Sequence, residues 1–177
     1  MPYVTLALRC LIGVVFLASA SSKVAGRGRL HAFRASVDAM GAVPGPLVPL
    51  VARLVVAAEF AVPLLLVLAP ALGFPLACGL LVAFVAGIVG TLRRGAAVPC
   101  RCFGASSRPL GREHVVRNVL LAGCALVGEA GVLLSDGAAN GGAAIAAALF
   151  AGACLAGLVI LLDDLLELFR PVRTPVR

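Results

Sequence analysis

Two cysteines stand one residue apart in the polar segment AAVPCRCFGASSRPLGREHVVRN, residues 96–118, which joins two apolar stretches. The α-carbons of residues two apart lie roughly 5–7 Å from each other, and a disulfide accepts about 4.4–6.8 Å. Cys100 and Cys102 can therefore bond to each other, in a small ring whose strain makes the bond easier to reduce. Nearby arginines favour the thiolate, which is the species that attacks a disulfide: Arg93, Arg94, Arg101 and Arg108. The pair is predicted to be catalytic in thiol–disulfide exchange.

Two other interpretations of this segment stay open. A zinc site needs four ligands, and the only candidates nearby are Cys100, Cys102 and His114. A second chain would have to complete such a site, and no metal is predicted for this chain. A lone C-x-C is a weak motif, and the two cysteines can instead be a static clip or a pair of unreactive thiols. The other four cysteines lie in apolar stretches, where a free cysteine behaves as a small hydrophobe.

The composition identifies the environment of this segment. The 177 residues are 62% hydrophobic and 13% charged, with a mean hydropathy of +1.10. A water-soluble domain of this size needs more polar surface than that, so an integral membrane protein is predicted. The net charge of +7 does not indicate nucleic-acid binding, because the arginines lie between apolar stretches and form no basic stripe with interleaved aromatics.

Five segments have roughly the 20 apolar residues that a membrane-spanning helix needs: about 3–22, 47–69, 71–92, 115–134 and 138–162. The predicted fold is therefore an all-α integral membrane bundle of about five transmembrane helices. Residues 27–41 are too polar to span but carry apolar residues at helical spacing, so a short interfacial helix is expected after the first span. The second and third spans are joined only by residues 69–73 and should form an antiparallel hairpin.

Basic residues are confined to alternate connections. The first and third connections and the C-terminal tail carry them, whereas the second and fourth carry none. Fourteen Arg against one Lys, with abundant Ala, Gly and Val, indicate a GC-rich bacterial genome, so a multi-pass protein of the bacterial cytoplasmic (inner) membrane is predicted. The positive-inside rule then predicts that the N-terminus is outside and the C-x-C segment cytoplasmic. Gly79, Ala83 and Gly87 recur every four positions on the third span. They predict close helix contact, either within the bundle or in a homodimer.

Glu59 lies near the middle of the second span, where an ionisable group costs about 2.5–3.5 kcal/mol to insert. It must be neutral, paired or next to a polar cavity, and Pro63, one turn later, disrupts the hydrogen bond to the carbonyl of Glu59. A packing role and a role in proton handling or quinone contact are equally supported. Lys23 and Arg53 lie near span ends, and both are expected to reach the membrane interface.

The fourth span has a predicted polar side in an otherwise apolar bundle. Arg117 and Asn118 open this span next to the cysteine segment, and Arg117 shares a helix face with Cys124, seven residues on. Glu129 shares a face with Asn118. Judged by depth in the membrane, Glu129 is expected to pair with Arg9 of the first span.

These features together resemble the MauE family of methylamine-utilisation membrane proteins, which is related to the DoxX group. The resemblance rests on CRCFG at 100–104 and RN at 117–118, together with the polar residues of the first two spans. It covers roughly residues 1–135, which are predicted to form a four-helix membrane core, and leaves a fifth transmembrane helix and a short basic tail at 136–177. By resemblance, Cys100 and Cys102 are the redox pair. The supporting polar residues are Lys23, Glu59, Arg117 and Asn118.

The resemblance implies a membrane component of thiol–disulfide traffic. The family is associated with maturation of methylamine dehydrogenase, a disulfide-rich periplasmic enzyme, and with a thioredoxin-like partner; methylamine utilisation, an amine metabolic process, is not required of this chain. The predicted function is a thiol–disulfide oxidoreductase component that assists the maturation or redox control of a partner protein. A quinone is considered as electron donor or acceptor, although no residue specifies one. The alternative is a non-catalytic assembly factor or small-molecule transporter with structural cysteines.

The predicted side of the cysteine pair conflicts with a periplasmic client. A relay of reducing equivalents across the membrane would resolve the conflict, and it would need a second thiol pair toward the outer face. Cys10 and Cys78 both lie in the outer halves of their spans and are the candidates for that pair.

Overall fold

The computed structural model of the chain describes residues 1–95, 111–134 and 141–168, with the backbone alone from residue 162 on. The helices are α1 (Pro2–Val24), α2 (Arg29–Ala39), the single turn η1 (Gly45–Leu47), α3 (Val48–Leu68), α4 (Pro70–Arg93), α5 (Arg112–Leu134) and α6 (Gly142–Leu168). Five of them, all but α2 and η1, are long and apolar enough to cross a membrane. The prediction of an all-α, multi-pass membrane bundle is therefore confirmed.

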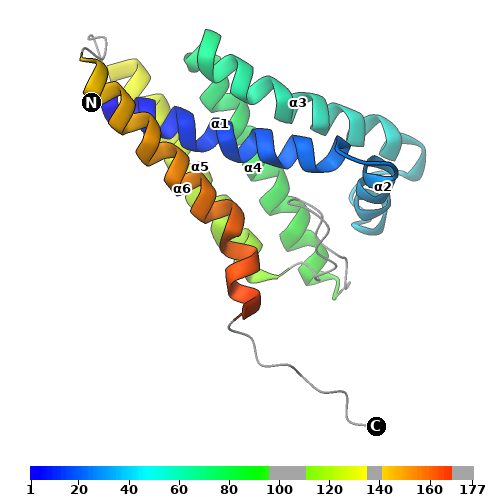
Figure 1. Cartoon of the computed structure of the whole chain (residues 1–177). Helices are drawn as coiled ribbons and strands as arrows, with labels where there is room; N and C mark the ends of the chain where they lie inside the picture. The colour runs from blue at the N-terminus through cyan, green and yellow to red at the C-terminus, as the bar shows by residue number, and fades with distance from the viewer. Residues whose placement is uncertain (96–110, 135–140, 169–177) are drawn as a thin grey trace.

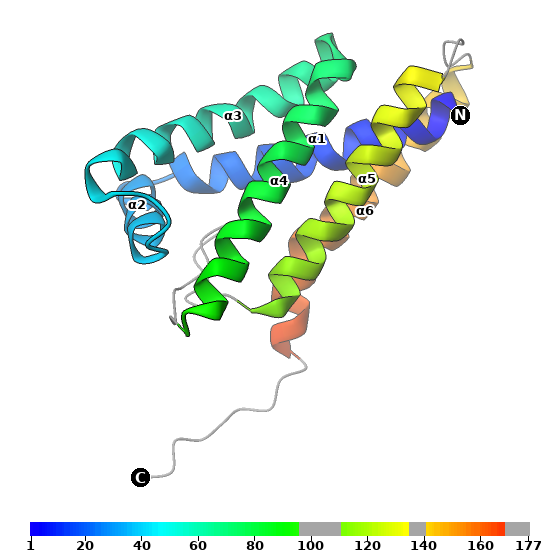
Figure 2. The same ribbon diagram turned by 180° about the vertical axis from the view of Figure 1, so that it is seen from behind.

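Helix α1 lies at the centre of the bundle. It packs against α3, α5 and α6, while α4 packs against α3 and α5 and so closes the other side (Figures 1 and 2). The shared core consists of apolar side chains from all five spans, with Ile12 and Phe74 fully enclosed among them. Because these residues recur at helical spacing on each span, each helix buries one stripe and turns the rest toward the lipid.

The predicted hairpin is confirmed, because only Ala69 separates α3 from α4. The two helices approach each other so closely after this turn that a Cβ on Gly73 would lie 2.6 Å from the backbone nitrogen of Leu66. A similar approach joins α6 to α1, where a Cβ on Gly152 would lie 2.8 Å from the Cβ of Cys10. We call this part of the bundle, with the α3–α4 turn and the N-terminal halves of α1 and α6, the hairpin end.

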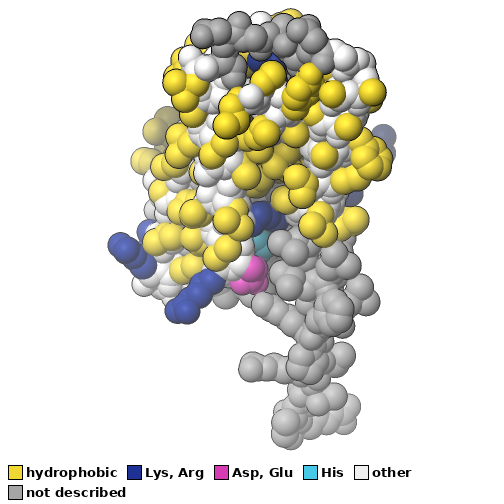
Figure 3. All heavy atoms as spheres, turned by 90° about the vertical axis from the view of Figure 1, so that its left-hand side faces the viewer, with side chains coloured by type: hydrophobic (Ala, Val, Ile, Leu, Met, Phe, Trp, Pro, Cys, Tyr) yellow, Lys and Arg dark blue, Asp and Glu magenta, His cyan; other side chains and the backbone are white. Residues whose placement is uncertain are grey.

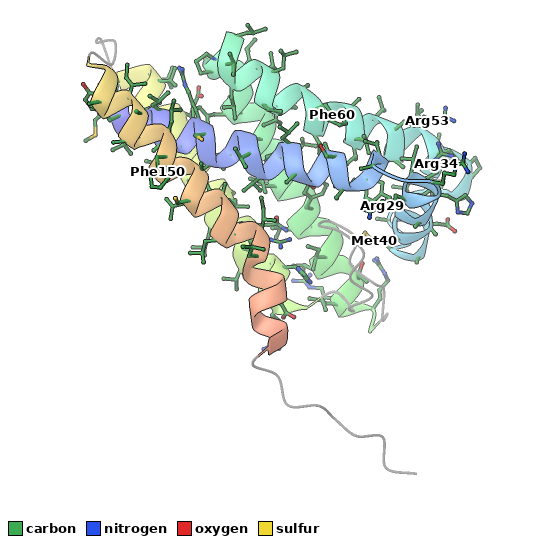
Figure 4. All side chains as sticks on the ribbon, viewed as in Figure 1. Arg29, Arg34, Met40, Arg53, Phe60 and Phe150 are labelled. Carbon is green, nitrogen blue, oxygen red and sulfur yellow. The ribbon has the colours of Figure 1, made fainter. Side chains whose placement is uncertain are left out.

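Helix α2 folds back against α3 at the opposite end of the bundle. Phe33 is buried there in a small apolar cluster with Ala52 and Val56. The guanidinium of Arg94, just after α4, donates a hydrogen bond to the carbonyl of Met40, just after α2. Figure 4 shows Met40 on the side of α2 that faces the end of α4, and Arg29, Arg34 and Arg53 near α2. We call this region, where α1 and α4 end and α3 and α5 begin, the basic end.

Two of the three residues of the small-residue stripe on α4 do not pack inside the bundle, whereas Gly87 is half-buried and a Cβ there would lie 3.8 Å from Met40 Sδ. Gly79 and Ala83 are exposed, and a Cβ on Gly79 would meet no atom within 4 Å. The stripe was predicted to make close helix contact either within the bundle or in a homodimer. For Gly79, contact within the bundle is therefore wrong. A homodimer through this face stays a prediction.

Candidate functional site

A buried ion pair joins α1 to α3 near the basic end. The Lys23 Nζ lies 2.6 Å from Oε1 and 2.8 Å from Oε2 of Glu59. Ser19, one helical turn before Lys23, donates to Glu59 Oε1 at 2.9 Å and accepts from Lys23 Nζ at 2.7 Å. Glu59 is 0% and Lys23 3% exposed, so the three side chains form a closed polar cluster inside the bundle.

Helix geometry brings the side chains of this cluster together. Residues 19 and 23 of α1 are four apart and therefore share a face, and that face meets α3 where Glu59 points inward. An ammonium has three N–H donors, and here all three are directed at Ser19 and at the two oxygens of Glu59. The rings of Phe33 and Phe84, with centroids 5.1 and 6.0 Å from Lys23 Nζ, add cation–π contacts.

Lys23 was expected to reach the membrane interface, and this expectation is wrong. A lysine near a helix end usually extends toward water, but α2 folds over this end of α1 and Glu59 supplies an opposite charge inside. Arg53, for which the same was expected, is exposed (Figure 4), and its position at the membrane interface stays a prediction. The sequence allowed Glu59 to be neutral, paired or next to a polar cavity, and in the structure it is paired with Lys23.

The first turns of α5 bury three further polar side chains, as the predicted polar side of this span requires. His114, Arg117 and Asn118 are each 4% exposed. The side-chain nitrogen of Asn118 has no hydrogen-bond partner among the described residues. It faces a cavity of about 10 Å³ that Ser19 and Phe84 also line, which is roughly the space of one water molecule.

A larger groove lies on the other side of α5. It has a volume of about 430 Å³, with Leu11 of α1 and Leu120 of α5 among its apolar walls and Leu155 and Val159 of α6 opposite. Arg117 and Cys124 both line it, which confirms that they share a face. Figure 3, which looks at the side that α6 covers, shows a hollow between apolar side chains with basic and acidic side chains at its lower end.

The predicted redox pair, Cys100 and Cys102, lies outside the described residues. The described chain stops at Gly95 and resumes at Gly111, so the cysteine segment connects the C-terminus of α4 to the N-terminus of α5. Among the described residues there is no group of three side chains that could hold a metal ion.

Of two other expectations about paired side chains, one is not met and one stays a prediction. No ion pair joins the described side chains of Arg9 and Glu129, and Arg9 Nε and Glu129 Oε2 are buried without a hydrogen-bond partner among the described residues. Arg9 and Glu129 are therefore not paired, and the prediction that they pair is wrong. Cys10 and Cys78, the candidates for an outer thiol pair, are free thiols. The Cys10 thiol donates instead to the carbonyl of Leu149 on α6, at 3.3 Å.

Sequence reasoning missed Ser19 and the two aromatic rings. Ser19 is inconspicuous in an apolar span, although its position four residues before Lys23 was a usable signal. Phe33 and Phe84 carry no sign of their role, because their proximity to Lys23 depends on how α2 and α4 pack around α1.

A comparison with protein families gives one match. The family described as methylamine utilisation protein MauE matches residues 1–130, which include all of the buried polar residues described above and the C-x-C segment. No curated protein matches the chain, and no solved structure matches it.

Proposed function

The chain belongs to the MauE family of methylamine utilisation proteins, and from this premise we propose that it is a thiol–disulfide redox component of the bacterial cytoplasmic membrane. It acts through Cys100 and Cys102 on a partner protein, either a thioredoxin-like protein or a disulfide-containing client. This thiol–disulfide exchange controls the maturation or the redox state of the partner.

The observation that carries this proposal is the position of the buried polar residues. Ser19, Lys23 and Glu59 lie inside the basic end, and Arg117 and Asn118 lie in the first turns of α5, directly after the cysteine segment. Burying polar groups in a membrane bundle is costly, and a chain that only crossed the membrane would not require it. Most of the buried polar residues lie toward the end of the bundle at which the cysteine segment joins α4 to α5.

The exchange itself conserves atoms and electrons. The thiolate of one cysteine attacks a partner disulfide, the S–S bond of the partner breaks, and one partner thiolate leaves as the mixed disulfide forms. The second cysteine then attacks this mixed disulfide and releases the second partner thiolate. Two electrons have passed to the partner, and Cys100 and Cys102 are left joined. The same steps in reverse place a disulfide in the partner.

A transport role with Glu59 in the pathway is less well supported. Both carboxylate oxygens of Glu59 are engaged by Lys23, and the only cavity described beside this cluster has a volume of about 10 Å³. A substrate larger than water would have to break a buried ion pair, which costs about 3–5 kcal/mol when one partner is left alone. We therefore assign the cluster to positioning the basic end.

The side of the membrane on which the exchange occurs follows from charge. The basic end contains Lys23 and Arg94 and is continuous with the basic cysteine segment, and the positive-inside rule places such segments in the cytoplasm. A cytoplasmic thioredoxin-like protein is the partner that fits this orientation. A client on the opposite side would require a relay through the membrane.

The test uses single cysteine variants of the full-length chain in membranes. We expect Cys100→Ser or Cys102→Ser to accumulate a mixed disulfide with a partner, because the resolving thiol is missing, and the adduct should disappear on reduction. The double variant should form none, whereas Cys154→Ser, which removes an exposed thiol on α6, should behave like the parent. Absence of adducts in both single variants, with partner maturation unchanged in the double variant, would contradict the proposal.

A further inference from the structure

The groove between α5 and α6 has the size of a small-molecule site and is open on the outer side of the bundle. Both helices pack on α1, whose Leu11 forms part of the floor. Two wall residues, Leu120 and Leu155, are largely exposed, so a molecule can enter sideways from the bilayer. The volume of about 430 Å³ lies within the range of about 300–1,000 Å³ that is typical of small-molecule sites.

The polar groups of the groove are concentrated at one end. Arg117 and Glu113 line it, one turn apart near the start of α5, and the other described lining residues are apolar apart from Cys124 with its thiol. The formal charges of the guanidinium and the carboxylate cancel. A lipid phosphate bound by Arg117 would lie next to the carboxylate of Glu113, and the two negative charges would repel each other. The charge balance therefore favours a neutral ligand with hydrogen-bond acceptors at one end.

We propose that this groove binds an isoprenoid quinone, with a ring carbonyl accepting a hydrogen bond from Arg117 and the chain lying along Leu120, Leu155 and Val159. A guanidinium carries five N–H donors, which is enough to serve a ligand in addition to a protein partner. The quinone ring is flat, neutral and apolar with acceptors at its edge, and it is supplied by the bilayer. The groove matches each of these properties.

This inference rests on the proposed function, for which it names the electron acceptor. The thiols of Cys100 and Cys102 lose two electrons and two protons and form one S–S bond. The quinone takes up the two electrons and two protons and becomes a quinol. The exchange then runs toward disulfide formation in the partner, because the cysteine pair is returned to its oxidised form.

The absence of tryptophan from the chain provides a direct binding assay. Leu155→Trp places a fluorophore in the groove, and Leu158→Trp places one on the same helix, on a residue that does not line it; the two native leucines are 49% and 54% exposed. Each full-length variant is titrated in detergent with decylubiquinone, whose ring quenches indole fluorescence. We expect saturable quenching at one quinone per chain for Leu155→Trp and only linear, collisional quenching for Leu158→Trp.

The head-group contact is tested in the Leu155→Trp background. Arg117→Gln should raise the half-saturating quinone concentration about tenfold or more, because a hydrogen bond from a charged donor is lost, and Arg117→Lys should recover part of the affinity. Equal linear quenching of both tryptophans would overturn the inference. So would displacement of the quinone by stoichiometric phosphatidylglycerol, which would make the groove a lipid site.

The binding assay separates this inference from the proposed function. Saturable quenching should persist when Cys100→Ser and Cys102→Ser are added, since the proposed contacts are made by Arg117, Leu120, Leu155 and Val159. In the parent chain, decylubiquinone should convert the reduced pair to a disulfide, detected as loss of alkylation. Mixed disulfides with a partner but no saturable quenching would overturn only the quinone site, whereas quenching without thiol oxidation would overturn the role of the quinone as electron acceptor.

Discussion

The two ends of the bundle are held together by different means. At the hairpin end the backbones themselves meet, and Gly73 and Gly152 lie where a Cβ would collide with the neighbouring helix. At the basic end the contacts are between side chains, and they include the buried pair of Lys23 and Glu59 and the cation–π contact to Phe33. Both described cavities that contact α5 also contain polar residues near this end.

This difference separates structural residues from those available for chemistry. Where backbones pack this closely, no extra atom is tolerated. The basic end, by contrast, contains a compensated charge pair, an amide nitrogen with no hydrogen-bond partner among the described residues and a groove with a polar end. If the account is right, substitutions at the two ends should fail in different ways, and we rank them by the expected loss of stability.

The largest effect should come from breaking the ion pair on one side only. Lys23→Met or Glu59→Leu leaves the other charge buried and alone, which should lower the free energy of unfolding by about 3–5 kcal/mol. The double variant replaces both charges by apolar groups and should recover most of that loss. Thermal and denaturant unfolding of the full-length chain in detergent measures all three. If the double variant loses as much as the two single variants together, the side chains do not act as a pair.

A smaller but clear loss should follow from adding one methyl group at the hairpin end. Gly73→Ala puts a Cβ against the backbone of Leu66, and such overpacking costs about 1–3 kcal/mol. Gly79→Ala is the matched control on the same helix, since nothing lies within 4 Å of its new Cβ, and its stability should match or slightly exceed that of the parent. The same unfolding assay applies, and equal behaviour of the two variants would contradict the close hairpin contact.

The smallest change in stability should come from Asn118→Leu. The side-chain nitrogen of Asn118 is buried without a hydrogen-bond partner among the described residues, so removing it abolishes a desolvation penalty of about 1–3 kcal/mol. We expect the variant to lie within about 1 kcal/mol of the parent or to be more stable. A loss as large as that of Glu59→Leu would mean that the amide is fully hydrogen-bonded in the membrane, through water in the adjoining cavity.

The parts of this structure that sequence predicted are those set by local geometry. The five spans follow from apolar segments of sufficient length, and the α3–α4 hairpin follows from a connection too short for anything else. The buried side of α5 followed from the spacing of Arg117, Asn118 and Cys124, because the helical period fixes which residues share a face.

The parts that sequence missed depend on how separate helices are rotated about their axes. Depth alone suggested that Arg9 pairs with Glu129 and that Lys23 reaches the interface, and both expectations were wrong. Lys23 and Glu59 are 36 residues apart in sequence, and their pairing is decided by which face of α1 meets which face of α3. Nothing in the spacing within either helix encodes that choice.

The most direct test of the account is the redox state of Cys100 and Cys102 in the membrane. A variant that keeps only these two cysteines is treated with a membrane-impermeant maleimide, in intact cells and in inverted vesicles, with and without prior reduction. The account predicts that labelling requires reduction, because the resting pair is a disulfide, and that it occurs in inverted vesicles, because the segment is cytoplasmic. Full labelling of both thiols without reductant, from either side of the membrane, would contradict the claim that this pair works in thiol–disulfide exchange.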